Sequence, residues 1–259
     1  MTLSTFQLKL LLVALLAVSV GKAQSQSRAE QKSFAVRGGL SGGFDVGAGF
    51  QSNHLNPSLT YYELTSLVRS KAVFVGWTAR LSAFYGNDLN YYSAPARLTR
   101  AETIDTVSFD RLSQTSLNVG IRAEWNLGRL QFGASVDLLG FTFLGRSQIG
   151  KVNSSTGLFI QQDSLGQDRQ KPFQGPDAFQ RASPTRFNIR LLGDHDRGML
   201  TTEVYTRVYL VPTVALKVGY QWLTTEVVLA NRDQVANNDR FRNRVGLFTV
   251  ALTVPLNPW

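Results

Sequence analysis

The chain contains no cysteine and only two histidines among its 259 residues. The absence of cysteine excludes disulfides, thiolate metal sites and cysteine nucleophiles together. It also suits export through an oxidising periplasm, where free cysteines would mispair. Acid–base chemistry that needs an imidazole is restricted to His54 and His195.

The sequence also lacks any run of about 18 apolar residues, which excludes an ordinary helical membrane span. Charged residues make up only 17% of the chain, alongside 11% aromatic residues and 22 glycines. Because backbone polar groups must pair internally in hydrocarbon, a membrane protein of this composition has to be a closed β-barrel.

The N-terminal residues form a separate segment. Lys9 precedes the apolar run 10–20, and Gly21 and Ala23 place small residues at positions −3 and −1 of a cut after Ala23. This pattern predicts a secretory signal peptide over 1–23. The polar stretch 24–33 predicts a flexible lead-in. The expected barrel therefore occupies 34–259.

Charge is unbalanced in favour of basic residues. Removing Lys9 and Lys22 leaves 25 basic against 18 acidic residues, a net charge of about +7. No tract of about 5–8 Lys or Arg residues is present, which argues against a nucleic-acid partner. The excess instead suits an anionic membrane surface.

Apolar and polar residues alternate with period two, starting in FAVRGGLSGGFDVGAGF at 34–50. Phe44 and Val46 lie on one face, whereas Arg37 and Asp45 lie on the other, as in a strand with two different faces. The six glycines are not a phosphate-binding loop, because the G-x-x-x-x-G-K-[ST] pattern is missing and no helical pattern follows. We expect the lumen-facing glycines to make room around Arg37 and Asp45.

The same alternation recurs along the chain. We predict strands over 34–50, 58–66, 71–85, 114–126, 129–144, 199–210, 213–230 and 244–256. Short joins at 67–70, 127–128 and 211–212 alternate with long joins at 51–57, 86–113, 145–198 and 231–243. Outer-membrane barrels place short turns in the periplasm and long loops outside. The predicted fold is therefore all-β, an antiparallel up-and-down transmembrane β-barrel of eight strands with long extracellular loops.

One segment fits this scheme poorly. Residues 186–198 are strand-like in their first half although they fall inside the longest predicted loop. They are expected to pair with neighbouring strands above the membrane, and a ten-stranded barrel is the alternative.

The two faces of the predicted strands differ in chemistry. The polar face carries charges of both signs: Arg37, Asp45, Arg80, Arg122, Glu124, Asp137, Glu203, Arg207 and Lys217. The apolar face carries aromatic residues toward strand ends, as an interfacial girdle requires: Trp77, Tyr85, Trp125, Tyr220 and Trp222. These features favour a membrane barrel with a polar lumen over a soluble carrier with an apolar lumen.

The predicted signal peptide, the alternating strands, the long joins and the GYQW stretch at 219–222 resemble the small outer-membrane β-barrel proteins of Gram-negative bacteria, the OmpA/OmpX-like group. The resemblance covers essentially the whole mature chain. It implies a monomer in the outer membrane, in contact with lipid that includes lipopolysaccharide. It specifies architecture rather than activity, since the group includes adhesins, structural proteins, resistance factors and a few enzymes.

The C-terminus departs from that group. Such barrels commonly end on an aromatic residue after an alternating strand, whereas Pro255 and Pro258 interrupt the stretch before Trp259. The end of the last strand is therefore open at this point.

Candidate chemistry is sparse. A serine hydrolase or acyl transferase would need His54 or His195 beside a serine and an orienting group, and the sequence supplies no such second member. Oxygen ligands that could bind a hard cation occur in two groups: Asp194 with Asp196, and Asp233 and Asp239 with Asn237 and Asn238. The simpler interpretation is that both groups are solvent-exposed charge in loops. Four arginines near the last loop suit either lipopolysaccharide phosphates or a basic rim that orients the barrel: Arg232, Arg240, Arg242 and Arg244.

The expected function is that of an integral outer-membrane barrel with a packed lumen, whose exposed loops carry a surface, structural or binding role. Eight strands enclose a lumen that side chains can fill, and buried mixed charges satisfy one another. A small-solute channel or transporter and a lipid-acting barrel enzyme are the alternatives. We assign no catalytic, cofactor-binding or metal-ligating residue, and we expect no cofactor.

Overall fold

The computed structural model describes residues 39–94, 105–191, 195–234 and 238–256. The predicted signal peptide, the lead-in, Arg37 and Trp259 lie outside the described residues. None of the described residues forms a helix long and apolar enough to cross a membrane.

The described residues form thirteen strands and one short 3-10 helix. In chain order these are β1 (Leu40–Gln51), β2 (His54–Ser66), β3 (Val73–Ser93), β4 (Thr106–Leu127), β5 (Leu130–Leu144), β6 (Gln148–Asn153), β7 (Leu158–Gln162), β8 (Asp168–Pro172), η3 (Gly175–Ala178), β9 (Phe179–Pro184), β10 (Phe187–Ile189), β11 (Leu200–Val211), β12 (Val214–Asp233) and β13 (Asn238–Leu256).

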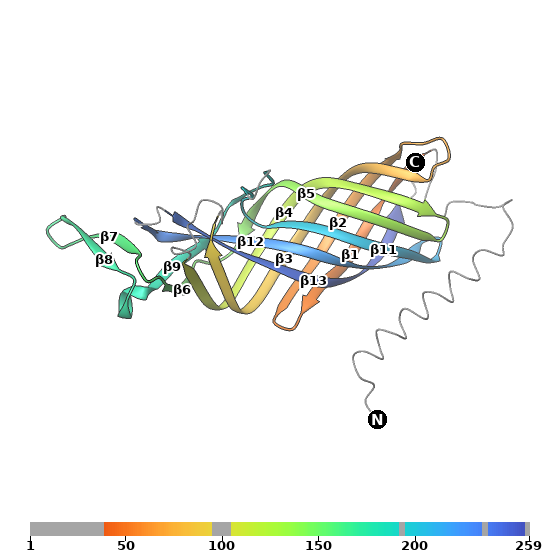
Figure 1. Ribbon diagram of the computed structural model, residues 1–259. Coiled ribbons are helices and arrows are strands. Elements are labelled where there is room, and N and C mark those ends of the chain that lie inside the picture. The colour runs from red at the N-terminus through yellow and green to blue at the C-terminus, as the bar shows by residue number, and fades with distance from the viewer. Residues whose placement is uncertain (1–38, 95–104, 192–194, 235–237, 257–259) are drawn as a thin grey trace, which may run out of the picture. The chain divides into compact units, whose positions relative to one another are not determined.

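Eight of these strands close into a barrel in the order β1-β2-β3-β4-β5-β11-β12-β13, and β13 pairs back onto β1 (Figure 1). Every pairing in this ring is antiparallel. The closing pair runs from Gly42 opposite Leu256 to Phe50 opposite Phe248. The predicted eight-stranded antiparallel barrel is confirmed, and the ten-stranded alternative is wrong.

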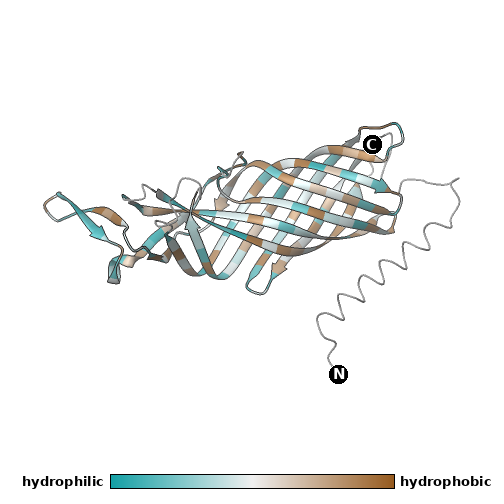
Figure 2. Ribbon diagram, in the orientation of Figure 1, coloured by the Kyte–Doolittle hydropathy of each residue, from teal (hydrophilic) through white to brown (hydrophobic). Residues whose placement is uncertain are grey.

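The barrel wall follows the predicted alternation, which Figure 2 shows as changing hydropathy along each strand. The five predicted girdle residues, Trp77, Tyr85, Trp125, Tyr220 and Trp222, all face outward, with 36–53% of their surface exposed. Aliphatic residues such as Val46, Ile121 and Leu252 fill the outer face between them. An apolar outer band with aromatic residues is what a bilayer requires of a barrel, so the soluble-carrier alternative is wrong.

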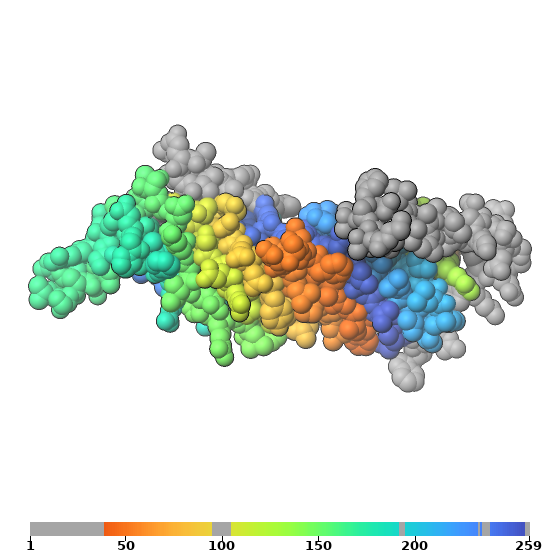
Figure 3. Space-filling view, turned by 90° about the horizontal axis from the view of Figure 1, so that it is seen from below, coloured from red at the N-terminus to blue at the C-terminus, as the bar shows by residue number. Residues whose placement is uncertain are grey.

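A second, smaller ring of strands continues one end of the barrel. There β13 pairs with β3, β3 with β4, β4 with β6, β6 with β9, β9 with β12, and β12 with β13. We call this closed circuit of six strands the external ring. The β7–β8 hairpin lies at the same end of the barrel as the external ring. Figure 3 shows the segment between β5 and β11 at that end, beyond the barrel strands.

The external ring forms because the β1–β2 hairpin is short. β1 ends at Gln51 and β2 begins at His54, so only two residues join them. Above this turn β13 meets β3 directly, with Phe241 opposite Ser93. Ending one hairpin early therefore reduces the number of strands in the wall without opening it.

The wall reverses its polarity where the external ring begins. In β3 the inward residues are even-numbered up to Gly86 and odd-numbered from Leu89 onward. The phase changes at Asn87 and Asp88, which are both exposed, and Asp88 has a positive φ of 52°. β4 changes phase at the same level, through the exposed pair 110–111. The two strands change phase together, so their register is kept while a new set of side chains points inward.

The external ring has an apolar interior, in contrast to the barrel below it. Its buried core combines residues from all six ring strands with residues around β7 and β8, among them Leu89, Tyr91, Val107, Phe109, Val152, Phe159, Phe173, Ala182, Val227, Leu229 and Phe241. Tyr91 and Phe109 pack edge to face at 5.4 Å. This is the inside-apolar pattern of a protein surrounded by water.

Four predicted joins need correction. The join 51–57 is a tight turn, and Pro57 lies in β2 where the pairing with β3 is interrupted between Leu55 and Ser58. The join 86–113 is mostly strand, since β3 reaches Ser93 and β4 starts at Thr106. Strands β6 to β10 occupy much of 145–198, and β12 and β13 extend into 231–243. These segments read as loops because their polar residues face outward, the reverse of the membrane wall.

Two open points at the strand ends are resolved. The segment at 186–198 contains β10, which pairs with β5 from Phe187 opposite Phe141 to Ile189 opposite Leu139. It takes up the edge of β5 above the last contact with β11, at Val136. The final strand runs through Pro255, opposite Gly43, to Leu256.

Candidate functional site

The barrel lumen holds an ionic core of eight residues, four basic and four acidic. They are Asp45, Arg80, Arg122, Glu124, Asp137, Glu203, Arg207 and Lys217, each at most 3% exposed. All eight were predicted from their positions on the polar face. Balanced charge matters here because an unpaired ion in this environment costs several kcal/mol.

Asp45 on β1 is the hub of the core. Its Oδ2 lies 2.9 Å from Arg122 Nη1 and 3.0 Å from Lys217 Nζ, and its Oδ1 lies 3.5 Å from Arg207 Nη2. The Thr253 hydroxyl donates to the same Oδ1 at 2.6 Å. One carboxylate therefore joins strands from opposite sides of the wall.

The remaining acids extend this network. Lys217 Nζ also contacts Glu203 Oε2 at 2.9 Å, and Arg80 Nη2 contacts the same oxygen at 3.0 Å. Arg80 Nε lies 3.4 Å from Asp137 Oδ1. A continuous chain of ion pairs therefore crosses the lumen, as the packed-lumen prediction requires.

Two tyrosines pack among the charges. Arg122 Cζ lies 4.1 Å from the ring centre of Tyr62 and 4.7 Å from that of Tyr205. The Tyr205 hydroxyl donates to Glu124 Oε1 at 2.5 Å. Guanidinium groups stacked on aromatic faces gain cation–π attraction when both are desolvated.

Glycines make room for Tyr205. Gly133 and Gly219 lie opposite Tyr205 on the two neighbouring strands. A Cβ at Gly133 would come within 2.3 Å of the tyrosine ring, and a Cβ at Gly219 within 2.7 Å of its Cβ. Glycine on the polar face thus relieves crowding in the lumen, as predicted, but the side chain accommodated here is a tyrosine. In β1 the side chains nearest Gly43 and Gly49 are Tyr62 and Gln221, so the expectation that these glycines make room around Asp45 is wrong.

Apolar layers lie on both sides of the ionic core. At the end with the short turns, Leu64, Phe74 and Tyr209 are each at most 2% exposed. At the other end Phe84 and Leu247 begin the apolar interior of the external ring. Tyr91 and Thr225 share a hydrogen bond of 2.8 Å within that interior. Burial raises the pKa of Tyr91, so the group stays a neutral phenol.

The two histidines lie in different elements. His54 begins β2 and stacks on Phe84 with ring centres 5.8 Å apart. Its Nδ1 has no hydrogen-bond partner among the described residues, so no carboxylate orients the ring through that atom. His195 lies between β10 and β11, beside Asp196.

The predicted oxygen clusters are only partly described. Asp194, Asn237 and the side chains of Asp233 and Asn238 lie outside the described part. Asp196 accepts a hydrogen bond from the Leu191 amide at 2.9 Å and pairs with Arg190 at 3.4 Å. Within the described ranges, no group of three or more His, Asp or Glu residues is arranged to hold a metal ion.

Two of the four arginines near the last loop are committed to an internal contact. Arg240 Nη2 lies 2.7 Å and Arg242 Nη2 3.3 Å from Oε2 of Glu226, a carboxylate with no exposed surface. Both guanidinium groups also donate to the Asp196 carbonyl. This cluster fastens the segment after β10 to β12 and β13, so Arg240 and Arg242 are not an open rim. Sequence reasoning missed Glu226, whose position on the outer face gave no sign that another segment covers it.

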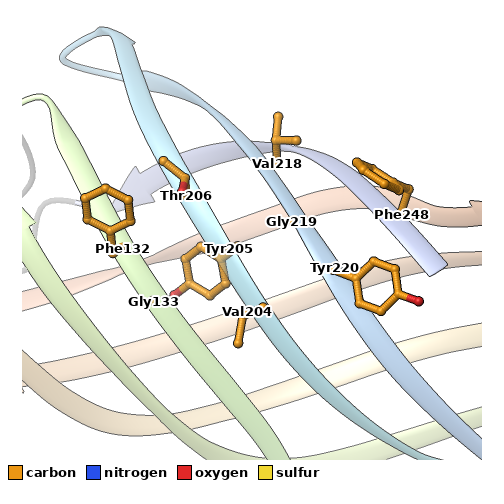
Figure 4. A pocket seen from close by; sticks show the side chains of 9 residues that line it. All are labelled: Phe132, Gly133, Val204, Tyr205, Thr206, Val218, Gly219, Tyr220 and Phe248. Atoms are coloured by element: carbon orange, nitrogen blue, oxygen red, sulfur yellow. The ribbon is translucent and has the colours of Figure 1, made fainter. Parts of the chain in front are cut away.

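A shallow depression of about 470 Å³ lies on the outer wall, as Figure 4 shows. Its floor lies at Gly133 and Gly219, and Phe132, Tyr220 and Phe248 stand around it. The same glycines that admit Tyr205 inside therefore thin the wall outside. The depression faces the lipid side and contains no charged group.

Comparisons with known proteins place the chain beside solved barrels at low similarity. No family model and no curated protein matches the sequence. Among solved structures, Neisserial surface protein A (NspA) is 9% identical, with a TM-score of 0.33, over 83% of this chain and 94% of that chain. Ail, the attachment invasion locus protein of Yersinia pestis, solved with the heparin analogue sucrose octasulfate, is 8% identical, with a TM-score of 0.31, over 84% and 96%.

The fold assignment rests on the strand pairings of this chain rather than on those similarities. Eight antiparallel strands close on themselves around an ionic core, and an apolar band with aromatic residues covers the outside. The chain is a small β-barrel of the outer-membrane type.

Proposed function

We propose that this chain is a non-conducting outer-membrane protein that anchors the external ring and the β7–β8 hairpin at the cell surface, where they carry a binding or structural role. The observation that carries the proposal is the reversal of polarity along the same strands. The barrel is apolar outside and ionic inside, whereas the external ring is polar outside and apolar inside.

The barrel has the polarity expected in lipid, and the external ring has the polarity expected in water. A lipid-facing wall needs apolar side chains outside, and polar groups can then gather in the lumen. A ring surrounded by water gains free energy by burying its apolar side chains instead. On this proposal the chain leaves the bilayer at the phase change in β3 and β4, and the external ring stands in water.

The direction of insertion follows from the unequal ends. The turns between β4 and β5 and between β11 and β12 contain two residues each. Short turns face the periplasm in barrels of this type, and larger elements face outward. The predicted export signal supports the same location, as does the basic balance of the chain.

A sealed lumen supports a non-conducting role. The ionic core lies between an apolar layer at the periplasmic end and the apolar interior of the external ring. A solute would have to break the ion pairs and part both layers. These features argue against the channel alternative and for a display role.

Surface labelling of introduced cysteines tests the location and orientation. Because the chain has no native cysteine, only the introduced thiol can react. Leu165→Cys places a thiol at the tip of the β7–β8 hairpin, where Leu165 is 80% exposed. Arg69→Cys places one in the exposed turn between β2 and β3. We expect a membrane-impermeant maleimide to label the first variant on intact cells and the second only after the outer membrane is opened. Labelling in the opposite order, or equal labelling of both, would overturn the proposal.

A further inference from the structure

A polar pocket of about 380 Å³ lies where β5 leaves the barrel. The chain after β5 runs antiparallel to the chain that links β9 and β10. The Thr142 amide donates to the Arg186 carbonyl at 2.7 Å, and Gln148 pairs with Ala182 further on. Between these two points the described ladder is open, and the pocket fills the gap.

The pocket is lined by two hydroxyl residues, a phenylalanine, a glycine, a proline and one cation. The lining residues are Thr142, Phe143, Gly145, Ser183, Pro184 and Arg186. Gly145 is needed where the two segments approach most closely, since a Cβ there would lie 2.6 Å from Pro184 Cγ. The two segments therefore pack closely at Gly145 and Pro184.

One arginine that lines this pocket and one that follows a lining residue in the chain have no side-chain partner among the described residues. Arg186 lines it, and Arg146 directly follows Gly145; both side chains are exposed and neither takes part in a described hydrogen bond or ion pair. The lumen arginines, in contrast, are all paired. An unpaired guanidinium offers a planar fork that suits phosphate oxygens.

The pocket lies immediately above exposed aromatic residues. Phe141 and Phe143 lie on the outer face of β5, 47% and 49% exposed, and Phe187 beside them is 75% exposed. The rings of Phe141 and Phe143 lie 5.8 Å apart. In outer-membrane barrels, girdles of aromatic residues flank the apolar band at its boundary with the headgroups. The pocket is therefore at headgroup height, with an acyl-binding surface below it.

We propose that this pocket binds the phosphate of a phosphorylated lipid in the outer leaflet, with Arg146 and Arg186 as donors and the three phenylalanines against the acyl chains. A free anion would use the arginines alone, whereas an amphiphile uses both halves of the arrangement. The inference deepens the proposed function, on which it relies for the leaflet that supplies the lipid. In a Gram-negative outer membrane that lipid is lipopolysaccharide.

The test uses the full mature chain in detergent and counts bound lipid by native mass spectrometry. The probes are diphosphoryl lipid A, the same lipid with both phosphates removed, and inorganic phosphate. We expect one diphosphoryl lipid A per chain, and we expect Arg146→Ala with Arg186→Ala to weaken binding by roughly tenfold or more, as loss of charge-assisted hydrogen bonds implies. Arg111→Ala with Arg197→Ala is the matched control, because both arginines are exposed outside the membrane wall, and it should bind like the parent.

A second variant guards against an indirect effect. Ser183→Trp fills the pocket without changing charge, and we expect the same loss of lipid A with retained heat-modifiable gel mobility. Equal binding of the dephosphorylated lipid, or unchanged binding by both the arginine and the tryptophan variants, would overturn the inference. So would displacement of lipid A by inorganic phosphate at equal concentration, which would mean a simple anion site. The readout does not depend on which way the chain is inserted in cells, so it separates this inference from the proposed orientation.

Discussion

Asp45 illustrates how single residues hold this lumen together. Its carboxylate meets three cations and one hydroxyl in a site with almost no exposed surface. Water cannot screen these charges, so each depends on the others. The position was visible in the sequence as an acid on the polar face of the first strand, but its three partners were not.

We predict that Asp45→Asn destabilises the barrel by about 3–5 kcal/mol, because it leaves excess positive charge buried. Adding Lys217→Met to that variant removes one uncompensated cation and should restore part of the loss. Urea unfolding in lipid vesicles measures both, and a double-mutant cycle isolates the coupling. Additive losses from the two substitutions would contradict a direct Asp45–Lys217 interaction.

The sequence patterns identified those residues whose role depends only on the face of the strand on which they lie. Period two assigned all eight lumen charges and all five girdle aromatics to the correct side, because a strand offers only two sides. Tyr62 and Tyr205 were not identified as lumen residues with a role. For Tyr205 a signal existed, since the tyrosine lies between charges on the polar face of β11 and GYQW places a glycine on the next strand.

At the scale of elements, β3 and β4 show why predicted strand ends fell short. Both strands continue for eight residues past their predicted limits, 86–93 in β3 and 106–113 in β4, but they change phase and reverse polarity there. The alternation expected of a lipid-facing strand, with apolar residues outside, therefore does not identify these extensions as strand. The pairing of β4 with β6 and of β9 with β12 joins segments far apart in sequence, and alternation carries no information on such partners.

The external ring depends on its apolar interior. We predict that Phe109→Ala loses about 3–5 kcal/mol of ring stability, since the removed side chain is buried against Tyr91 and leaves a cavity. Amide hydrogen exchange should show faster exchange in β6, β9 and the part of β4 that lies in the external ring, with the membrane part of β4 unchanged.

Phe179→Ala is the matched control for that experiment. Phe179 lies on the outer face of the ring and is 57% exposed, so its removal should change ring stability by no more than about 0.5 kcal/mol. If the two substitutions had equal effects, the ring would not be held by its interior core. Loss of the whole barrel in Phe109→Ala would instead mean that the two rings unfold as one unit.

At the scale of the whole molecule, the chain combines a membrane protein and a water-facing protein in one continuous set of strands. The ionic core and the apolar layers occupy successive levels of the same tube. Length and alternation were enough to predict a plugged eight-stranded barrel. The second ring was not predictable, because it arises from one short hairpin and a matched phase change in β3 and β4, whose effect appears only when the sheet closes.

Electrical recording on the purified mature chain in a planar lipid bilayer tests the sealed lumen most directly. Because ion pairs and two apolar layers close the tube, we predict no stepwise current above that of the bare bilayer over the whole range of applied voltage. Reproducible single-channel steps from the folded, heat-modifiable protein would contradict the account.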